Sequence, residues 1–158
     1  MESELLILAK QILKVNDKCA LSGSLALNNQ GIRTKREPED IDIYLPKDVE
    51  FILIPGMIEN DDFNKDDYRN DEWIRTQYII NKIKVDVFTP QVDFEFPLVI
   101  VRSNRIDVVR TEEIIKFKVA FAFDDHSSAE KHRVDVIYMM ENANNPLQIQ
   151  TNYDDLIF

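Results

Sequence analysis

The sequence is poor in the residues that build disulfides, zinc sites and serine-hydrolase turns. It has one cysteine, Cys19, so it can form neither an internal disulfide nor a cysteine metal cluster. His126 and His132 have no third ligand near them in the sequence, which argues against a zinc site. Ser22 and Ser24 lack the second flanking glycine of a nucleophile elbow. We therefore expect none of these three kinds of site.

The sequence also lacks a long apolar run. No stretch approaches the roughly 20 apolar residues that a membrane-spanning helix needs. The segment MESELLILAKQILK has no basic leading region and is interrupted by Lys10 and Gln11, so it is expected to be an amphipathic helix and not a signal peptide. With 44% apolar and 30% charged residues, the chain is expected to be a cytoplasmic globular protein that does not enter a membrane.

Positive charge is scarce, since the formal net charge is −10. Broad affinity for nucleic acid depends on Lys and Arg neutralising phosphates, so it is not expected here. Residues 59–72, ENDDFNKDDYRNDE, hold seven acids against two bases and supply half of the imbalance. We expect this segment to be a surface connection that is mobile or faces a basic partner and does not bind substrate phosphates. An acidic protein can still present a positive pocket, and Arg33, Lys35 and Arg36 form one basic cluster.

Hydrophobic periodicity predicts a single α/β domain over residues 1–145, in the α+β sense of a mixed β-sheet flanked by helices. Helices are expected after Ser3 as cap, from Leu25 to Asn29, after Thr111 as N-cap, and from a Ser127–Glu130 capping box to about Asn142. Strands are expected at 19–21, 40–45, 73–80, 82–88, 98–102 and 106–110, the last four as two hairpins around Asn81-Lys82 and Ser103-Asn104. The tail 146–158 receives no assignment.

Two of the expected strands carry acidic side chains on one face. Side chains at i and i+2 of a strand point to the same side, so Asp40 and Asp42 project together and away from Ile41 and Ile43. Asp86 stands opposite the apolar face of its own strand. If the two strands are neighbours, three carboxylates converge and raise one another's pKa values unless a cation intervenes. Mg²⁺, with Mn²⁺ as the alternative, suits such oxygen ligands and leaves positions for substrate phosphates.

Each of these signals has an ordinary structural explanation when it is taken alone. A D-x-D pair in an alternating strand, a single aspartate on a strand and a Gly-Ser turn are all common on solvated surfaces. What favours a phosphate and metal site is the order of the three: Gly23-Ser24, then Asp40 and Asp42, then Asp86.

That order resembles the nucleotidyltransferase superfamily related to DNA polymerase β. The stretches GSLAL, GIRTKREPEDIDIYL and KIKVDVF carry the resemblance, which covers roughly residues 18–140. GIRTKREPEDIDIYL is similar to the AbiEii-type toxin branch in particular, and TEEIIKFKVAFAF and KHRVDVIYM resemble the helices that follow in that branch. The branch usually has an arginine soon after the lysine helix; here Arg133 is the nearest candidate.

The resemblance implies a minimal nucleotidyltransferase-like fold and a role for each matching residue. Gly23 and Ser24 would hold the phosphates of a nucleotide at a helix start. The metal-binding and catalytic residues would be Asp40, Asp42 and Asp86, with Asp86 as the general base. The other nucleotide-binding residues would be Arg36, Lys118 and Asp135.

Helical geometry separates the two lysines of the helix that follows Thr111. Lys118 neighbours Ile114 and Ala122 on the apolar face, whereas Lys116 is rotated by about 200° toward solvent. We therefore expect Lys118 to point at the sheet. Asp135 has a structural alternative, an ion pair with Lys131 one turn earlier on an exposed face.

The sequence and the resemblance together predict a Mg²⁺-dependent nucleotidyltransferase. It would move a nucleoside monophosphate from an NTP such as ATP to an acceptor hydroxyl on RNA, protein or a small molecule, and release pyrophosphate. A toxin-like role with a cognate antitoxin is what the AbiEii branch implies. Two alternatives stay open: a catalytically inactive nucleotide-binding or regulatory subunit of the same fold, and a metal-dependent phosphodiesterase.

Overall fold

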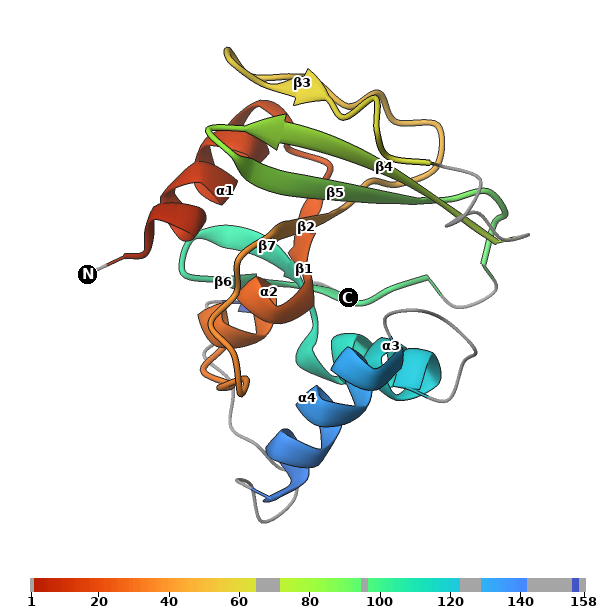
Figure 1. Ribbon diagram of the computed structural model, residues 1–158. Helices are drawn as coiled ribbons and strands as arrows, with labels where there is room; N and C mark the ends of the chain where they lie inside the picture. Colours follow the sequence, from red (N-terminus) through yellow and green to blue (C-terminus); the bar gives the residue numbers. More distant parts are fainter. Residues whose placement is uncertain (1, 65–71, 95–96, 123–128, 142–154, 157–158) are drawn as a thin grey trace.

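The computed structural model describes residues 2–64, 72–94, 97–122, 129–141 and 155–156. Within these ranges the chain forms four helices and one mixed sheet of eight strands (Figure 1). The strand order is β3-β4-β5-β2-β1-β7-β6-β8. The expected α+β architecture, a mixed sheet flanked by helices, is confirmed.

The first half of the chain follows the predicted order closely. It contains α1 (Glu4–Val15), β1 (Ala20–Ser22), α2 (Gly23–Asn29) and β2 (Ile41–Tyr44). The Ser3 hydroxyl accepts the Leu6 N–H at 3.2 Å, so the predicted cap of α1 is confirmed. Helix α2 begins at Gly23 and not at Leu25, because the positive φ of Gly23 turns the chain directly out of β1 into the helix.

The remaining strands are β3 (Ile58–Glu59), β4 (Trp73–Ile80), β5 (Ile83–Pro90), β6 (Ile100–Ser103), β7 (Ile106–Val109) and β8 (Asp155–Leu156). The β4–β5 turn is at Asn81-Lys82, as predicted, and the β6–β7 turn is at Asn104-Arg105, one residue later than predicted. Both pairs have positive φ angles, which suit the twist of a tight hairpin. Strands β3 and β8 were not predicted, because a two-residue strand has no periodicity to detect.

The last two helices that the structure describes are α3 (Thr111–Ala122) and α4 (Ala129–Glu141). The prediction that Thr111 is the N-cap is wrong. The Glu113 and Ile114 N–H groups bond to the Arg110 carbonyl, so Arg110 caps the helix. Thr111 instead donates its N–H and its hydroxyl to Gln30 Oε1, at 3.1 and 2.9 Å. Ser127, from the predicted capping box, lies outside the described residues.

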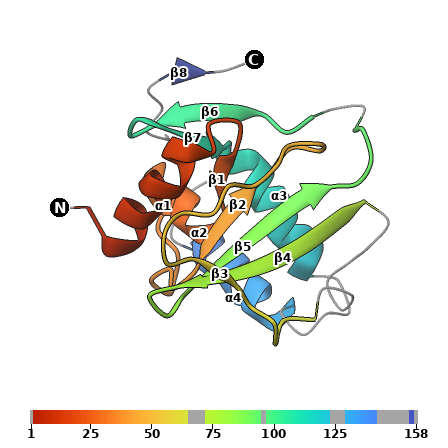
Figure 2. The ribbon, with the colours of Figure 1, turned by 90° about the horizontal axis from the view of Figure 1, so that it is seen from above.

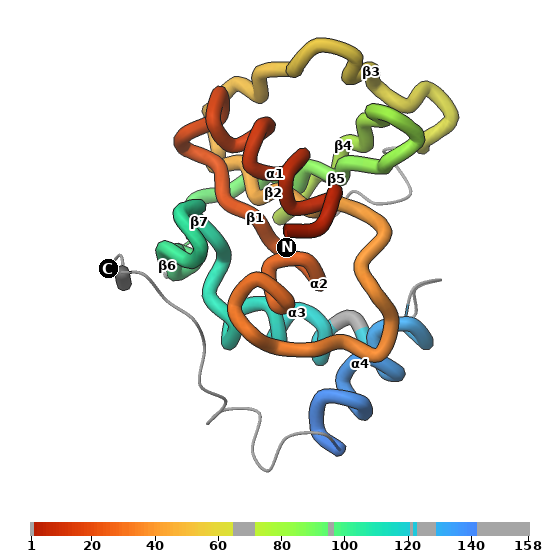
Figure 3. The backbone as a smooth tube through the Cα atoms, turned by 90° about the vertical axis from the view of Figure 1, so that its left-hand side faces the viewer, coloured from red at the N-terminus to blue at the C-terminus, as the bar shows by residue number. Residues whose placement is uncertain are grey.

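The sheet separates α1 from the other helices. Helix α1 covers one face, and α3 and α4 lie on the other (Figures 1 and 2). Strand β3 lies at one end of the molecule and α4 at the other (Figure 3). The central strands supply the core, in which Leu21, Ile41, Ile43, Val85 and Val108 are fully buried. Among the residues that the structure describes, none of the helices combines the length and the hydrophobicity of a membrane span.

Candidate functional site

Strand pairing places the two strand aspartates side by side. Strand β2 pairs in parallel with β5, and Asp42 is the register partner of Asp86. Strand β1 pairs with β2 on the other side, with Ser22 opposite Asp42. Asp40 lies just before β2. The condition on which the convergence of these carboxylates depended, that their two strands are neighbours, is therefore met.

The turn between β1 and α2 packs directly on Asp42. Gly23 has φ +67°, and a Cβ built on it would lie 2.0 Å from Asp42 Oδ2. A side chain at this position would collide with the carboxylate, so both the backbone angle and the close approach require glycine. The structure thus brings Gly23 and Asp42 together, although eighteen intervening residues separate them in the sequence.

The carboxylates make the site short of positive charge. Burial, and after it the neighbouring Asp86, raise the pKa of Asp42 to about 7, against the opposing effects of Arg75 and Lys118. The pKa of Asp40 is also raised, first by burial and then by Asp86. Removal from water and like charge both disfavour the ionised form. A bound cation would relieve both effects.

Lys118 joins α3 to the β1–α2 turn and to α4. Its Nζ donates to Ser24 Oγ at 3.2 Å and to Asp135 Oδ2 at 3.0 Å. Lys118 and Asp135 are both buried, whereas the Lys116 side chain is 74% exposed. The predicted orientation of the two lysines is confirmed. The structural alternative for Asp135, an exposed pair with Lys131, is wrong because Asp135 faces Lys118.

Two expected cations do not join this cluster. Arg36 lies on the loop before β2, and its side chain is exposed. Arg133, the candidate for the arginine after the lysine helix, donates to the Ala122 carbonyl at 2.9 Å and to Glu130 at 2.7 Å. In the part of the chain that the structure describes, no hydrogen bond or ion pair links either guanidinium to the carboxylates. A nucleotide-binding role for Arg36 stays a prediction.

Sequence reasoning missed the partners of Asp86. Arg75 Nη2 lies 2.9 Å from Asp86 Oδ2, and Gln77 Nε2 donates to Asp86 Oδ1 at 2.8 Å. The Gln77 amide in turn accepts from Asn60 Nδ2 at 2.6 Å. Arg75 and Gln77 are two residues apart on β4 and so share a face. Only the β4–β5 register, with Gln77 opposite Asp86, shows which carboxylate they contact.

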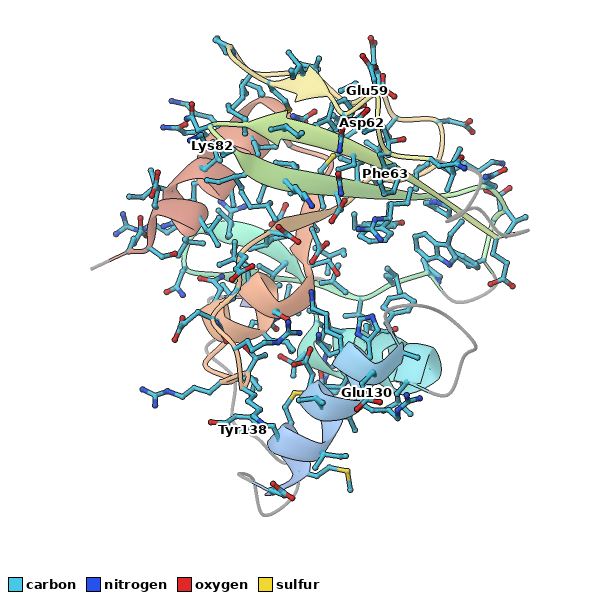
Figure 4. The ribbon with its side chains drawn as sticks, viewed as in Figure 1. Glu59, Asp62, Phe63, Lys82, Glu130 and Tyr138 are labelled. Atoms are coloured by element: carbon cyan, nitrogen blue, oxygen red, sulfur yellow. The ribbon has the colours of Figure 1, made fainter. Side chains whose placement is uncertain are left out.

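Two aromatic side chains lie against the guanidinium of Arg75. Its Cζ lies 5.2 Å from the ring centre of Phe63 and 5.4 Å from that of Phe88, distances typical of cation–π contacts. Phe63 lies beside β4 and β5 (Figure 4). These contacts correct the prediction for residues 59–72: Asn60 and Phe63 reach side chains of β4, so this part of the segment is not only a surface connection. Residues 65–71 lie outside the described part.

A second aromatic group lies on the same face of the sheet. Trp73 packs edge-on against Tyr44 and Phe117, with ring centres 6.2 and 5.8 Å apart. These contacts connect the sheet to α3 next to the carboxylates. Trp73 is only partly buried, so it packs between the layers without belonging to the fully buried core.

The three aspartates do not fit a metal ion as a triad. Among the described residues, no group of three or more His, Cys, Asp or Glu side chains is arranged to hold a metal. Asp86 already has a cation beside it, because one of its oxygens pairs with Arg75 and the other accepts from Gln77. Asp40 and Asp42 fit better, because Mg²⁺ is often held by one or two carboxylates together with substrate phosphates.

Comparison with known proteins supports the fold. No family model matches the sequence, and no curated protein sequence matches it. Two solved structures have a similar fold. One is JHP933 from Helicobacter pylori, with a TM-score of 0.54 and 16% identity over 92% of this chain and 70% of that one. The other is a "putative nucleotidyltransferase" from H. pylori, with a TM-score of 0.55 and 17% identity over 92% of this chain and 72% of that one. The chain therefore has a nucleotidyltransferase-like fold. Its resemblance to the AbiEii-type branch stays a prediction.

Proposed function

We propose that the chain is a nucleotidyltransferase that depends on Mg²⁺ or Mn²⁺. The observation that carries the proposal is the convergence of the Gly23 turn, the Asp42–Asp86 pair and the Lys118–Ser24 contact in a fold of this type. The acceptor hydroxyl would attack the α-phosphorus of an NTP. The bond from that phosphorus to the bridging oxygen would break, and pyrophosphate would leave.

Asp40 and Asp42 would hold the divalent ion, which would supply charge neutralisation at the phosphates. Their raised pKa values support this assignment, because a pair of carboxylates short of counter-charge gains most from a cation. Gly23 lets the turn approach Asp42 closely, so a phosphate held at the turn would lie next to the pair.

Lys118 would hold the phosphates that leave. An ammonium has three hydrogen-bond donors, and Lys118 uses two of them, on Ser24 and Asp135. The third is available for a phosphate oxygen. Asp135 fixes the ammonium in place, so its role is to position Lys118.

The contacts that Asp86 makes with Arg75 and Gln77 favour a second candidate function. A general base must take a proton from the acceptor, and Asp86 already has an ion pair with Arg75 on one oxygen and a hydrogen bond from Gln77 on the other. The acceptor hydroxyl would have to reach one of the remaining lone pairs of this buried carboxylate. If it does not reach one, the chain binds a nucleotide without transferring it, as a sensor or regulatory subunit would.

The test uses NTPs that carry a radiolabel on the α-phosphate, with Mg²⁺ and a cell extract as the source of acceptors. We expect the label to move to an acceptor, and we expect Asp42→Asn to abolish the transfer. Asp107→Asn is the matched control, because Asp107 pairs with Arg102 on β6 and β7, away from the cluster. Transfer that is equal in both variants would contradict the proposal.

Other outcomes distinguish the alternatives. Mg²⁺-dependent binding of the NTP without any transfer supports the second candidate, the binding protein. Hydrolysis that needs no acceptor supports a phosphodiesterase. If the chain binds no NTP with or without Mg²⁺, both nucleotide functions are wrong.

A further inference from the structure

Asp86 is enclosed by a set of side chains that sequence reasoning did not assign to the site. Its side chain is 3% exposed, and its two oxygens each have a partner. One partner is a guanidinium, which stays protonated at every pH at which proteins fold. Asp86 matches the third metal ligand of the superfamily that the sequence resembles. It is therefore already paired with a permanent positive charge.

The position of Arg75 is fixed by several contacts at once. Phe63 and Phe88 lie against its guanidinium, and the ion pair with Asp86 fixes its end. Gln77 is fixed in the same way, between Asp86 and Asn60. A side chain that is held by two aromatic rings and a buried carboxylate does not leave without losing all three contacts. The Arg75–Asp86 ion pair is therefore held in place by its neighbours on the β4–β5 hairpin, unlike an exposed ion pair on the surface.

Charge makes the guanidinium and a divalent ion compete for Asp86. Both would sit within bonding distance of the same carboxylate, and like charges at a few ångströms repel strongly in a partly buried site. Asp40 and Asp42 have no such ion pair among the described residues. The site thus divides into one carboxylate with a fixed cation and two carboxylates that lack one.

We propose that Arg75 is the resident cation of this site and keeps Asp86 out of the metal coordination. The NTP-bound chain then takes one divalent ion, on Asp40 and Asp42, and not two. The part about Asp40 and Asp42 rests on the proposed function, whereas the exclusion of Asp86 rests on its contacts with Arg75 and Gln77. Arg75 is a positioning residue, since it acts on Asp86.

The experiment counts bound ions. The full chain is mixed with a non-hydrolysable NTP analogue and titrated with Mn²⁺, and unbound Mn²⁺ is measured by electron paramagnetic resonance. The variants are Asp42→Asn, Asp86→Asn and Arg75→Gln. Arg102→Gln is the matched control, because Arg102 forms an ion pair of the same type with Asp107 at 3.0 Å on an exposed hairpin. Circular dichroism and a thermal melt confirm that each variant is folded.

We expect one Mn²⁺ per chain in the wild type, in Asp86→Asn and in Arg102→Gln, and none in Asp42→Asn. Arg75→Gln should bind two, because Asp86 then lacks its guanidinium partner and can ligate. If Arg75→Gln does not fold, Arg75→Lys keeps the charge and should bind one. The wild type and Asp86→Asn remain decisive in that case.

The outcomes separate this inference from the proposed function. Two ions in the wild type, with one lost in Asp86→Asn, would overturn the inference and leave the proposed function intact. A wild type that binds none while Arg75→Gln binds one would support the role of Arg75 and contradict metal dependence. Arg75→Gln with the same count as the wild type would overturn the inference.

Discussion

Lys118 on α3 and Ser24 on α2 are 94 positions apart in the sequence, yet the Lys118 ammonium donates to the Ser24 hydroxyl at 3.2 Å. The same ammonium pairs with Asp135 on α4 at 3.0 Å. One charged side chain thus connects the turn that is proposed to hold phosphates with both C-terminal helices. Nucleotide binding and the stability of this helical layer should therefore respond together when Lys118 is changed.

We expect Lys118→Ala to weaken NTP binding by about 1.5–3 kcal/mol, the range for a hydrogen bond to a charged group. It should also lower the free energy of unfolding by about 3 kcal/mol, because it leaves Asp135 buried without its cation. The double variant Lys118→Met/Asp135→Leu removes both charges, so it should regain stability but not NTP binding. Urea unfolding and titration with a fluorescent NTP measure the two effects.

The control for this pair is Lys116→Ala, since Lys116 is exposed and lies 3.9 Å from Glu113. Both its stability and its NTP affinity should stay within about 0.5 kcal/mol of the wild type. Equal effects of the two lysine substitutions on NTP binding would show that Lys118 has no special place in the site.

Gly23→Ala should destabilise the protein more than Gly56→Ala does. Both glycines have positive φ, so both substitutions carry the backbone strain of about 1–2 kcal/mol. The added Cβ at Gly56 meets nothing closer than 3.9 Å, whereas at Gly23 it would lie 2.0 Å from Asp42 Oδ2. Gly23→Ala should thus also displace Asp42 and abolish Mn²⁺ binding. Thermal melts and Mn²⁺ titration check this, and equal loss of stability in the two variants would contradict it.

Without a divalent ion, stability should fall as the pH rises through the titration of Asp42. Its pKa is raised to about 7 by burial and then by Asp86, with Arg75 and Lys118 opposing and Asp40 adding, while an unfolded aspartate titrates near pH 4. Between these values the folded state binds the extra proton. The stabilisation is therefore complete below about pH 4 and is lost as the pH rises through about 7.

Urea unfolding in EDTA at about pH 5 and about pH 8 measures this effect through the linkage of stability to proton binding. Asp42→Asn cannot titrate, so its stability should fall less between the two conditions than that of the wild type. Asp61→Asn, at an exposed position, is the control and should behave like the wild type. The same decline in Asp42→Asn as in the wild type would mean that Asp42 is not the group responsible.

Gln30→Leu should lower both stability and NTP affinity. The fully buried Gln30 amide donates to the Ala26 and Val109 carbonyls and accepts from the N–H and hydroxyl of Thr111. Leucine fills a similar volume but leaves the Val109 and Thr111 groups unpaired, at about 1–3 kcal/mol for each group. Because this amide ties α2 to α3, its loss should also loosen the Lys118–Ser24 contact.

The matched control is Gln11→Leu on the exposed side of α1, which should change stability by less than about 0.5 kcal/mol. Urea unfolding and NTP titration measure both variants. A Gln30→Leu protein that is as stable as Gln11→Leu would contradict the role given to this amide.

Local periodicity was sufficient for several features of the fold. The alternation in β2 put Ile41 and Ile43 in the core and Asp42 on the other face. The helical repeat in α3 predicted that Lys118 is buried and Lys116 exposed, as the structure shows. Such features follow from the geometry of one element, which repeats every two residues in a strand and every 3.6 in a helix.

The face that a candidate residue occupies on its own helix or strand therefore follows from local sequence. The neighbours of that face come from the packing of the whole chain: Asp86 next to Asp42, Arg75 and Gln77 on Asp86, and Gln30 on Thr111. Periodicity contains no information about which strand becomes a neighbour or in what register, since both depend on the burial of the whole sheet. For this reason the alternating strands suggested three metal-binding carboxylates. The pairing of β4 with β5 places Arg75 beside one of them, Asp86.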